Sequence, residues 1–81
     1  VTVLEDGFPA GVYVNRFEGA NGRFVRNLLN VLTTTRQVDI PVRPGWRYVE
    51  LLSGEILEPK DGKVTCLLRP KAILSVAEEP L

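Results

Sequence analysis

Apolar and polar residues alternate along several short runs of this chain, which is the pattern of β-strands with one buried face. The clearest run is 37–42, in which Val38, Ile40 and Val42 share one face. Three more runs alternate or are rich in strand-forming residues, and turn residues bound each of them: 11–17, 63–68 and 72–76. The pattern therefore predicts a β-strand in each of the four runs.

Tight turns separate these runs. Residues 19–22 include two glycines and an asparagine that tolerate positive φ, residues 53–54 are Ser-Gly, and residues 61–62 are Asp-Gly, the strongest short-range hairpin signal in the chain. Pro41 and Pro44 restrict their stretch to an edge strand or a strand end, because proline donates no backbone hydrogen bond. Short strands joined by such turns favour antiparallel pairing.

The run Arg23–Leu32 has two readings. Apolar residues recur at helical spacing at Phe24, Leu28, Val31 and Leu32. A strand would instead carry apolar residues on both faces, as a central strand covered on both sides does. We favour the strand because a hairpin turn precedes the run, and the helix stays the alternative. Seven or eight such short strands predict an all-β fold, a small antiparallel β-sandwich with Greek-key-like strand order.

Composition and charge exclude several kinds of site and partner. The 81 residues include no histidine and one cysteine, so the chain holds no Ser-His or Cys-His pair, no His-ligated metal, no internal disulfide and no Cys-pair zinc site. Ten basic and ten acidic residues cancel, which gives no electrostatic case for nucleic acid or an anionic membrane. The apolar runs are also far shorter than the roughly 20 residues of a membrane helix. We therefore expect no catalytic, metal or cofactor site within this chain.

The length and the missing methionine predict how the chain is organised. A chain of 81 residues has room for one core, so residues 1–81 are expected to form a single domain. The sequence contains no methionine, the initiator included, which predicts that the domain belongs to a longer protein.

An ordered series of short motifs runs through the last two-thirds of the chain. In chain order the motifs are Leu28–Asn30, Val38–Val42, Pro44–Trp46, Glu50–Glu55, Asp61–Val64 and Pro70–Val76. The series resembles the small C-terminal β-sandwich of glycoside hydrolases, as in the alpha-amylase superfamily and in bacterial beta-galactosidases with a barrel catalytic domain. Two features depart from that pattern: apolar residues 31–32 follow Asn30, and 69–72 replaces the usual proline-proline-aromatic-glycine approach to the last strand.

The resemblance implies a supporting role for this domain. In such enzymes the domain usually carries no catalytic residue and packs against the barrel that does. The expected partner is therefore the catalytic domain of the same parent chain, a glycoside hydrolase, and an apolar patch is expected around the edge of one sheet. Two alternatives stay open: a carbohydrate-binding module that uses exposed aromatic residues, and a domain that forms a homo-oligomer through its edge strands.

Trp46 and Tyr48 are the candidate contact residues. They occupy alternate positions of one run and so share a face, on which the two rings can stack a sugar. The alternative is that Trp46 packs into the core or against a neighbouring domain, where large aromatic side chains contribute most. We expect Tyr13, Phe17 and Phe24 at core or half-buried strand positions.

The acidic residues are weighed as catalytic candidates because glycoside hydrolysis requires a pair of carboxylates. Glu50 and Glu55 flank the 53–54 turn, but we expect both to be solvated or paired with basic residues. Glu78 and Glu79 are expected in a frayed tail. No catalytic residue is therefore assigned to this chain.

The remaining candidates are arginines and the cysteine. Arg16, Arg23 and Arg26 are expected to lie close together once the 19–22 turn forms, and arginine is enriched at protein interfaces. A solvated surface balanced by glutamates is the alternative. Cys66 is expected to be a small inward-facing apolar residue, with no base beside it in the sequence to activate the thiol.

Overall fold

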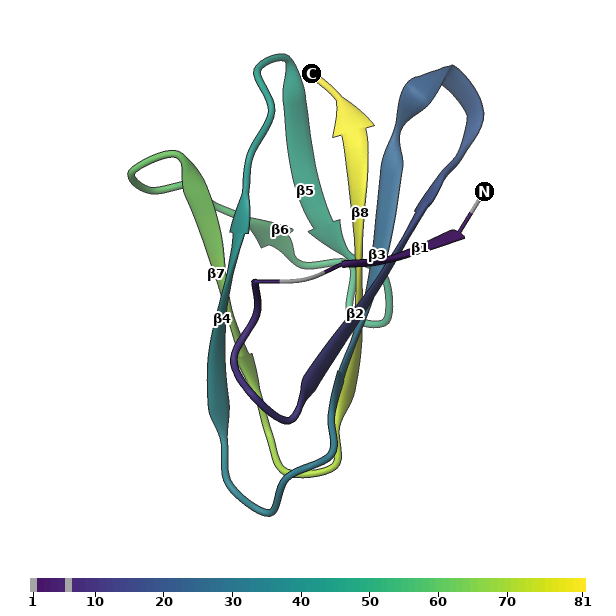
Figure 1. Ribbon diagram of the computed structural model, residues 1–81. Coiled ribbons are helices and arrows are strands. Elements are labelled where there is room, and N and C mark those ends of the chain that lie inside the picture. The colour runs from purple at the N-terminus through teal and green to yellow at the C-terminus, as the bar shows by residue number, and fades with distance from the viewer. Residues whose placement is uncertain (1, 6) are drawn as a thin grey trace.

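A computed structural model describes residues 2–5 and 7–81 of the chain (Figure 1). Within these residues the regular structure is β-strand, apart from one short 3-10 turn, η1 (Ala20–Gly22). The strands are β1 (Thr2–Glu5), β2 (Val12–Glu18), β3 (Phe24–Asn30), β4 (Arg36–Pro41), β5 (Trp46–Glu50), β6 (Ile56–Leu57), β7 (Lys63–Leu68) and β8 (Ile73–Pro80). The strand pairings are antiparallel, so the predicted all-β antiparallel fold is confirmed.

The strands form two layers. The larger sheet has six strands in the order β1-β2-β3-β8-β5-β6, and the smaller sheet pairs β4 with β7. The chain crosses between the layers after β3, β4, β6 and β7, and the β3–β4 and β7–β8 crossings lie at the same end of the molecule (Figure 1). This two-layer, Greek-key-like arrangement confirms the predicted sandwich of seven or eight strands.

The ambiguous run Arg23–Leu32 forms strand β3 and not a helix. β3 lies between β2 and β8 in the larger sheet. Leu28, on the face toward the smaller sheet, is fully buried, and Val25, on the opposite face, is 6% exposed. Apolar residues therefore occupy both alternating series of a strand in the middle of a sheet, which confirms the strand interpretation.

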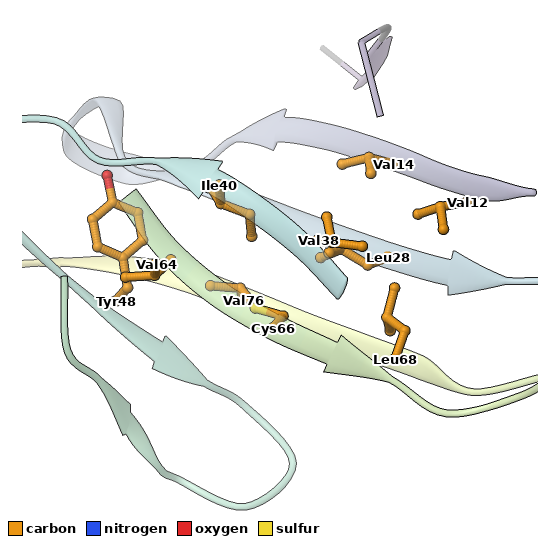
Figure 2. Close-up of a cluster of buried hydrophobic side chains, with 10 residues drawn as sticks. All are labelled: Val12, Val14, Leu28, Val38, Ile40, Tyr48, Val64, Cys66, Leu68 and Val76. Carbon is orange, nitrogen blue, oxygen red and sulfur yellow. The ribbon is translucent and has the colours of Figure 1, made fainter. Parts of the chain in front are cut away.

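The core lies between the two layers (Figure 2). Alternate residues of β4 and β7 point into it, so the alternation of runs 37–42 and 63–68 is confirmed. Each fully buried aliphatic side chain contributes about 1.5–3 kcal/mol to stability. The buried cluster comprises Val12, Val14, Leu28, Val38, Ile40, Tyr48, Val64, Cys66, Leu68 and Val76.

The predicted turns form, and one of them joins strands of different sheets. Residues 19–22 connect β2 to β3, and residues 53–54 connect β5 to β6. Across residues 61–62 the backbone groups of Lys60 and Lys63 exchange hydrogen bonds of 2.7 and 3.2 Å, and both turn residues have positive φ. β6 and β7 then diverge into separate sheets. The Asp-Gly signal therefore predicts the turn correctly, but not a hairpin within one sheet.

β8 is longer than the sequence pattern predicts. The predicted run ends at Val76, whereas the strand continues to Pro80 because it lies between β3 and β5 and pairs with both. Glu78 within it is 1% exposed. The prediction of a frayed tail at Glu78 and Glu79 is therefore wrong.

Gly11, directly before β2, is expected to tolerate no side chain. Its φ of +82° is a conformation that residues with a Cβ rarely adopt, and a Cβ built there would collide with the side chain of Leu32. We expect Gly11→Ala to lower the free energy of unfolding by about 2 kcal/mol, measured by urea denaturation. Gly45→Ala is the control, because Gly45 has a φ of +86° but no described atom within 4 Å of the added Cβ. Equal losses in the two variants would contradict the collision.

Candidate docking surface

The larger sheet has one face toward the core and one toward solvent. Its solvent-facing side chains are those that alternate with the core residues along each strand, and we call this surface the outer face. Several of its apolar side chains are 36–64% exposed: Leu4, Tyr13, Phe17, Leu29, Ile56 and Ile73. The prediction of core or half-buried positions is therefore wrong for Tyr13 and Phe17, whereas Phe24 is half-buried as predicted.

Strand register places five outer-face residues in one row across the sheet. Phe17 pairs with Val25, and Val25 with Ala77. Ala77 pairs with Val49, and Val49 with Ile56. The three middle residues are at most 8% exposed. The row is therefore apolar from β2 to β6, and its exposed side chains are those at its two ends, Phe17 and Ile56.

A second, shorter apolar row crosses β2, β3 and β8. In this row Tyr13 pairs with Leu29, and Leu29 with Ile73. Tyr13 and Phe17 stand four residues apart in one strand. At about 3.4 Å per residue, the two apolar rows therefore lie about 13 Å apart.

Polar side chains occupy the row between the two apolar rows. Asn15 pairs with Asn27, and Asn27 with Ser75, whose hydroxyl donates to Asn27 Oδ1 at 2.7 Å. Beyond the longer apolar row, an ion pair of 2.8 Å joins Arg47 of β5 to Glu79 of β8. Apolar area with polar groups at its margin is the usual anatomy of a protein interface.

The solvent-facing side of the smaller sheet has a different character. Gln37 and Asp39 alternate with the core residues of β4, and the Thr65 hydroxyl donates to Asp39 Oδ1 at 2.7 Å. Among the described residues of β4 and β7, Leu67 is the one large apolar side chain that is exposed. Extended exposed apolar area marks interaction sites, which makes the outer face the candidate site of this chain. The sequence predicts an apolar patch around a sheet edge, and the exposed apolar residues of the outer face come from β1, β2, β3, β8 and β6.

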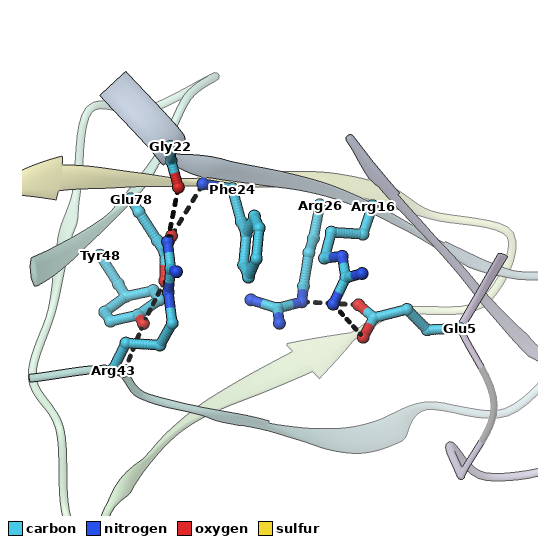
Figure 3. A network of polar contacts seen from close by, with 8 residues as sticks. All are labelled: Glu5, Arg16, Gly22, Phe24, Arg26, Arg43, Tyr48 and Glu78. Carbon is cyan, nitrogen blue, oxygen red and sulfur yellow. Dashed lines mark hydrogen bonds and ion pairs between the residues drawn. The ribbon is translucent and has the colours of Figure 1, made fainter. Parts of the chain in front are cut away.

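At one end of the core, Glu78 of β8 joins three parts of the chain (Figure 3). Its carboxylate accepts hydrogen bonds from the Phe24 backbone N–H at 2.7 Å and from the Tyr48 hydroxyl at 2.6 Å. Arg43 donates to it through Nε at 3.0 Å and through Nη2, which also donates to the Gly22 carbonyl at 2.8 Å. Four donors thus converge on one buried carboxylate.

These donors keep Glu78 ionised. Burial raises the pKa of the Glu78 carboxyl, but the hydrogen bonds from Arg43, Tyr48 and the Phe24 N–H outweigh it, so the net pKa is below the ordinary value. Burial, and then the bond to Glu78, raise the pKa of Tyr48, so its hydroxyl stays protonated at neutral pH. A carboxylate in this state has no proton to donate and no free oxygen to offer a ligand.

Three arginine guanidiniums surround the ring of Phe24. Their carbons lie 3.8 Å (Arg43), 4.5 Å (Arg16) and 5.7 Å (Arg26) from the ring centroid, distances at which cations are attracted to an aromatic face. Arg16 and Arg26 are register partners on β2 and β3, so their predicted proximity is confirmed. The third guanidinium at this ring belongs to Arg43, whereas the sequence predicts Arg23 beside Arg16 and Arg26.

Trp46 and Tyr48 point toward the core rather than toward the outer face. Tyr48 is fully buried, and Trp46 is half-buried against the core with Arg43 5.0 Å from its ring. Two rings placed in this way do not form an exposed platform. Contact of this pair with a carbohydrate or another domain stays a prediction, and of the two residues Trp46 is the one that is only half-buried.

Glu50 is 7% exposed, so the expectation of a solvated or ion-paired side chain is wrong. Its oxygens accept hydrogen bonds from the backbone N–H groups of Leu52 and Ser53 and from the Ser53 hydroxyl, at 3.0–3.1 Å. Burial raises the pKa of Glu50, but these hydrogen bonds outweigh it and the net pKa is lowered. The carboxylate thus holds the turn between β5 and β6, whereas Glu55 is exposed as predicted.

Cys66 is buried and faces the core as predicted. With Glu50 and Glu55 it lines a hollow of about 360 Å³ beside β7. Burial raises the pKa of the Cys66 thiol to about 11, so the thiol stays protonated and unreactive.

Among residues 2–5 and 7–81 no group of three or more Cys, Asp and Glu could hold a metal ion. Within the same residues no helix is long and apolar enough to cross a membrane.

Comparison with known proteins relates this fold to solved structures. No protein-family model matches the chain, and no curated protein matches its sequence. AmyP, solved with maltotriose bound, matches the whole chain with a TM-score of 0.79 and 16% identity. An Anoxybacillus alpha-amylase matches 99% of it with a TM-score of 0.74 and 18% identity. A Bacteroides fragilis protein described as an alpha-galactosidase/melibiase matches 88% of it with a TM-score of 0.72 and 13% identity.

The chain spans only a small part of each of these proteins. It covers 17% of the AmyP chain, 18% of the alpha-amylase and 16% of the Bacteroides protein. The fold is one that glycoside hydrolase chains contain. At these identities the likeness concerns the fold alone, and in each of the three proteins that fold is one part of a much longer chain.

Proposed function

We propose that this chain is a non-catalytic accessory domain of a glycoside hydrolase, which packs against the catalytic barrel of the same protein and stabilises it. The observation that carries the proposal is the outer face, an exposed apolar surface on one side of the sandwich. The fold likeness to parts of glycoside hydrolase chains and the motif series that begins at Leu28 support the identity of the partner.

The two buried carboxylates, Glu50 and Glu78, support a non-catalytic role. The oxygens of Glu50 and Glu78 are engaged by donors of this chain, and both pKa values are lowered. A glycosidase needs one carboxylic acid that is protonated near neutral pH, together with a second carboxylate across a cleft. Neither side chain is suited to the first role.

Covering the outer face stabilises the domain and its partner together. Each Å² of apolar surface removed from water contributes about 25 cal/mol, and interfaces between domains of one chain bury about 600–1,500 Å². Because a tether holds the two domains at a high effective concentration, even a weak interface is occupied. The expected result is a catalytic domain that unfolds together with this one.

The rows of the outer face restrict the partner surface. The partner must present apolar groups at the spacing of the two apolar rows, about 13 Å, with polar groups opposite the row between them. If the partner surface were displaced by one row along the strands, its apolar groups would cover the Asn15 and Asn27 amides. Burying such an unpaired polar group costs about 1–3 kcal/mol. The polar row therefore fixes the register of docking.

The test compares two matched variants in the full-length product that carries this chain. Ile73→Asp places a charge on the outer face, where Ile73 is 57% exposed, and Leu67→Asp places the same charge on the opposite sheet, where Leu67 is 65% exposed. We expect calorimetry to show one shared unfolding transition for the unmodified protein and for Leu67→Asp. For Ile73→Asp we expect two separate transitions, because burial of an unpaired charge opens the interface. Identical traces for the two variants would contradict the proposal.

A further inference from the structure

The turn between β5 and β6 presents two leucines to solvent. Leu51 is 48% exposed and Leu52 is 79% exposed. Tight turns are ordinarily built from glycine, proline, asparagine, aspartate and serine, each for a conformational reason that does not apply to leucine. The two leucines are therefore not explained by the turn itself.

Hydrogen bonds hold this turn in one conformation. The Glu50 N–H donates to the Glu55 carbonyl at 2.9 Å, and the Gly54 N–H donates to the Glu50 carbonyl at 2.8 Å. The buried Glu50 carboxylate accepts the N–H groups of Leu52 and Ser53, both at 3.0 Å. A side chain presented from such a turn loses little conformational freedom when it binds, which favours affinity.

The turn is continuous with the outer face. The Leu51 N–H donates to the Ser75 carbonyl at 2.8 Å, and Ser75 belongs to the polar row of that face. On the other side of the turn, Ile56 ends the longer apolar row. A body that covers the outer face as far as β6 thus reaches the turn as well.

We propose that Leu52 is a second anchor for the catalytic domain, inserting from this turn into an apolar socket of the same body that covers the outer face. The inference rests on the proposed function, because it takes its partner from there. It adds that the contact continues past the sheet to the turn that the Glu50 carboxylate holds. Energetically dominant interface contacts lie in well-packed, fully desolvated pockets surrounded by near-neutral contacts that exclude water, and an apolar socket around Leu52 would have this form.

Thiol labelling of the full-length product tests this inference. Leu52→Cys, Ile73→Cys and Gln37→Cys report on the anchor, the outer face and the exposed side of β4. Each is treated with N-ethylmaleimide, and labelling of the relevant peptide is followed by mass spectrometry. Each rate is divided by the rate for the same variant in concentrated urea, which removes differences in intrinsic reactivity. We expect Leu52→Cys and Ile73→Cys to react at least about tenfold more slowly than Gln37→Cys, because labelling then requires the interface to open.

The other outcomes separate the two proposals. If Ile73→Cys is protected and Leu52→Cys reacts as fast as Gln37→Cys, the second anchor is overturned and the proposed function stands. If both react as fast as Gln37→Cys, the proposed function fails as well. Protection of Leu52→Cys that disappears on dilution would assign the contact to a second copy of the protein, which also overturns the inference.

Discussion

Replacing Glu78 with glutamine is expected to lower the free energy of unfolding by about 3 kcal/mol at neutral pH, measured by urea denaturation. Four donor groups point at the two carboxylate oxygens of Glu78. The glutamine amide has one oxygen that can accept hydrogen bonds from these donors, and its own N–H groups would face the remaining donors. This expected loss of unfolding free energy lies at the lower end of the range for breaking a buried ion pair. The reason is that the Arg43 side chain is 37% exposed, so water can solvate its charge.

Glu79→Gln is the matched control for this loss. Glu79 is the next residue of the same strand, and its carboxylate pairs with Arg47 at the surface, where both side chains are at least 36% exposed. Exposed pairs contribute about 0–1 kcal/mol, so the control is expected to lose little. Similar losses in Glu78→Gln and Glu79→Gln would show that the buried network does not stabilise the fold.

The contribution of Glu78 depends on pH with a defined sign. Its pKa in the folded protein is lowered, so the stabilisation is fully present above the unfolded pKa of about 4.3 and is lost as the pH falls through the folded pKa. Glu50 contributes with the same sign. Urea denaturation from pH 7 to pH 3 should therefore show a difference between Glu78→Gln and the unmodified protein that is constant above about pH 5.5 and shrinks toward pH 3. A difference that grows on acidification would contradict the assignment of an ionised Glu78.

Replacing Asn30 with alanine is expected to cost about 2–4 kcal/mol of unfolding free energy. Asn30 is fully buried where β3 ends. Its Nδ2 group donates to the carbonyls of Thr34, Leu68 and Arg69 at 2.9–3.1 Å, and its Oδ1 accepts the Leu32 N–H at 3.0 Å. One side chain thus joins the β3–β4 and β7–β8 crossings, and alanine leaves these backbone groups without a partner.

Asn27→Ala is the comparison for Asn30→Ala, and urea denaturation of both variants measures the difference. Asn27 lies in the same strand but on the outer face, and its Oδ1 accepts the Ser75 hydroxyl. Water can replace that single bond, so the expected loss is below about 1 kcal/mol. A loss for Asn30→Ala as small as that for Asn27→Ala would show that the crossings do not depend on the buried amide.

The strands could be predicted because most of them have one buried face. β4 and β7 alternate between core and solvent, so the period of two along Gln37–Val42 and Lys63–Leu68 is a direct consequence of the sandwich. β3 could not be assigned from its period, since it carries apolar residues on both faces: Leu28 toward the core, and Val25 and Leu29 on the outer face. The turn at residues 19–22 favoured the strand over the helix, because a hairpin connection brings the following run alongside the preceding strand, with which it pairs.

The buried carboxylates could not be predicted because their partners are distant in sequence. Arg43 lies 35 residues from Glu78, and Tyr48 lies 30 residues from it. Nothing local to the Glu78-Glu79 pair shows which of the two faces the core. Glu50 differs in this respect, because its donors lie two and three residues ahead and a carboxylate followed by a tight turn is a recognisable local arrangement.

The outer face could be predicted only in part. Alternation shows that Tyr13 and Phe17 share a face, and that Leu29 lies opposite Leu28. It does not show which face meets the second sheet. That choice is made by the whole set of strands, because the series that carries Val12, Val14, Leu28 and Val76 packs on β4 and β7. The second apolar series is then left at the surface.

The position of β8 has a consequence for synthesis of the protein. β8 follows the other seven described strands in sequence order, yet it occupies the middle of the larger sheet between β3 and β5. Until residues 73–80 leave the ribosome, β3 and β5 each keep a bare edge, and such edges attract chaperones, proteases and wrong strand partners. The larger sheet is therefore closed only once residues 73–80 have paired with both strands, and a chain that stops before residue 73 keeps two bare edges inside this sheet.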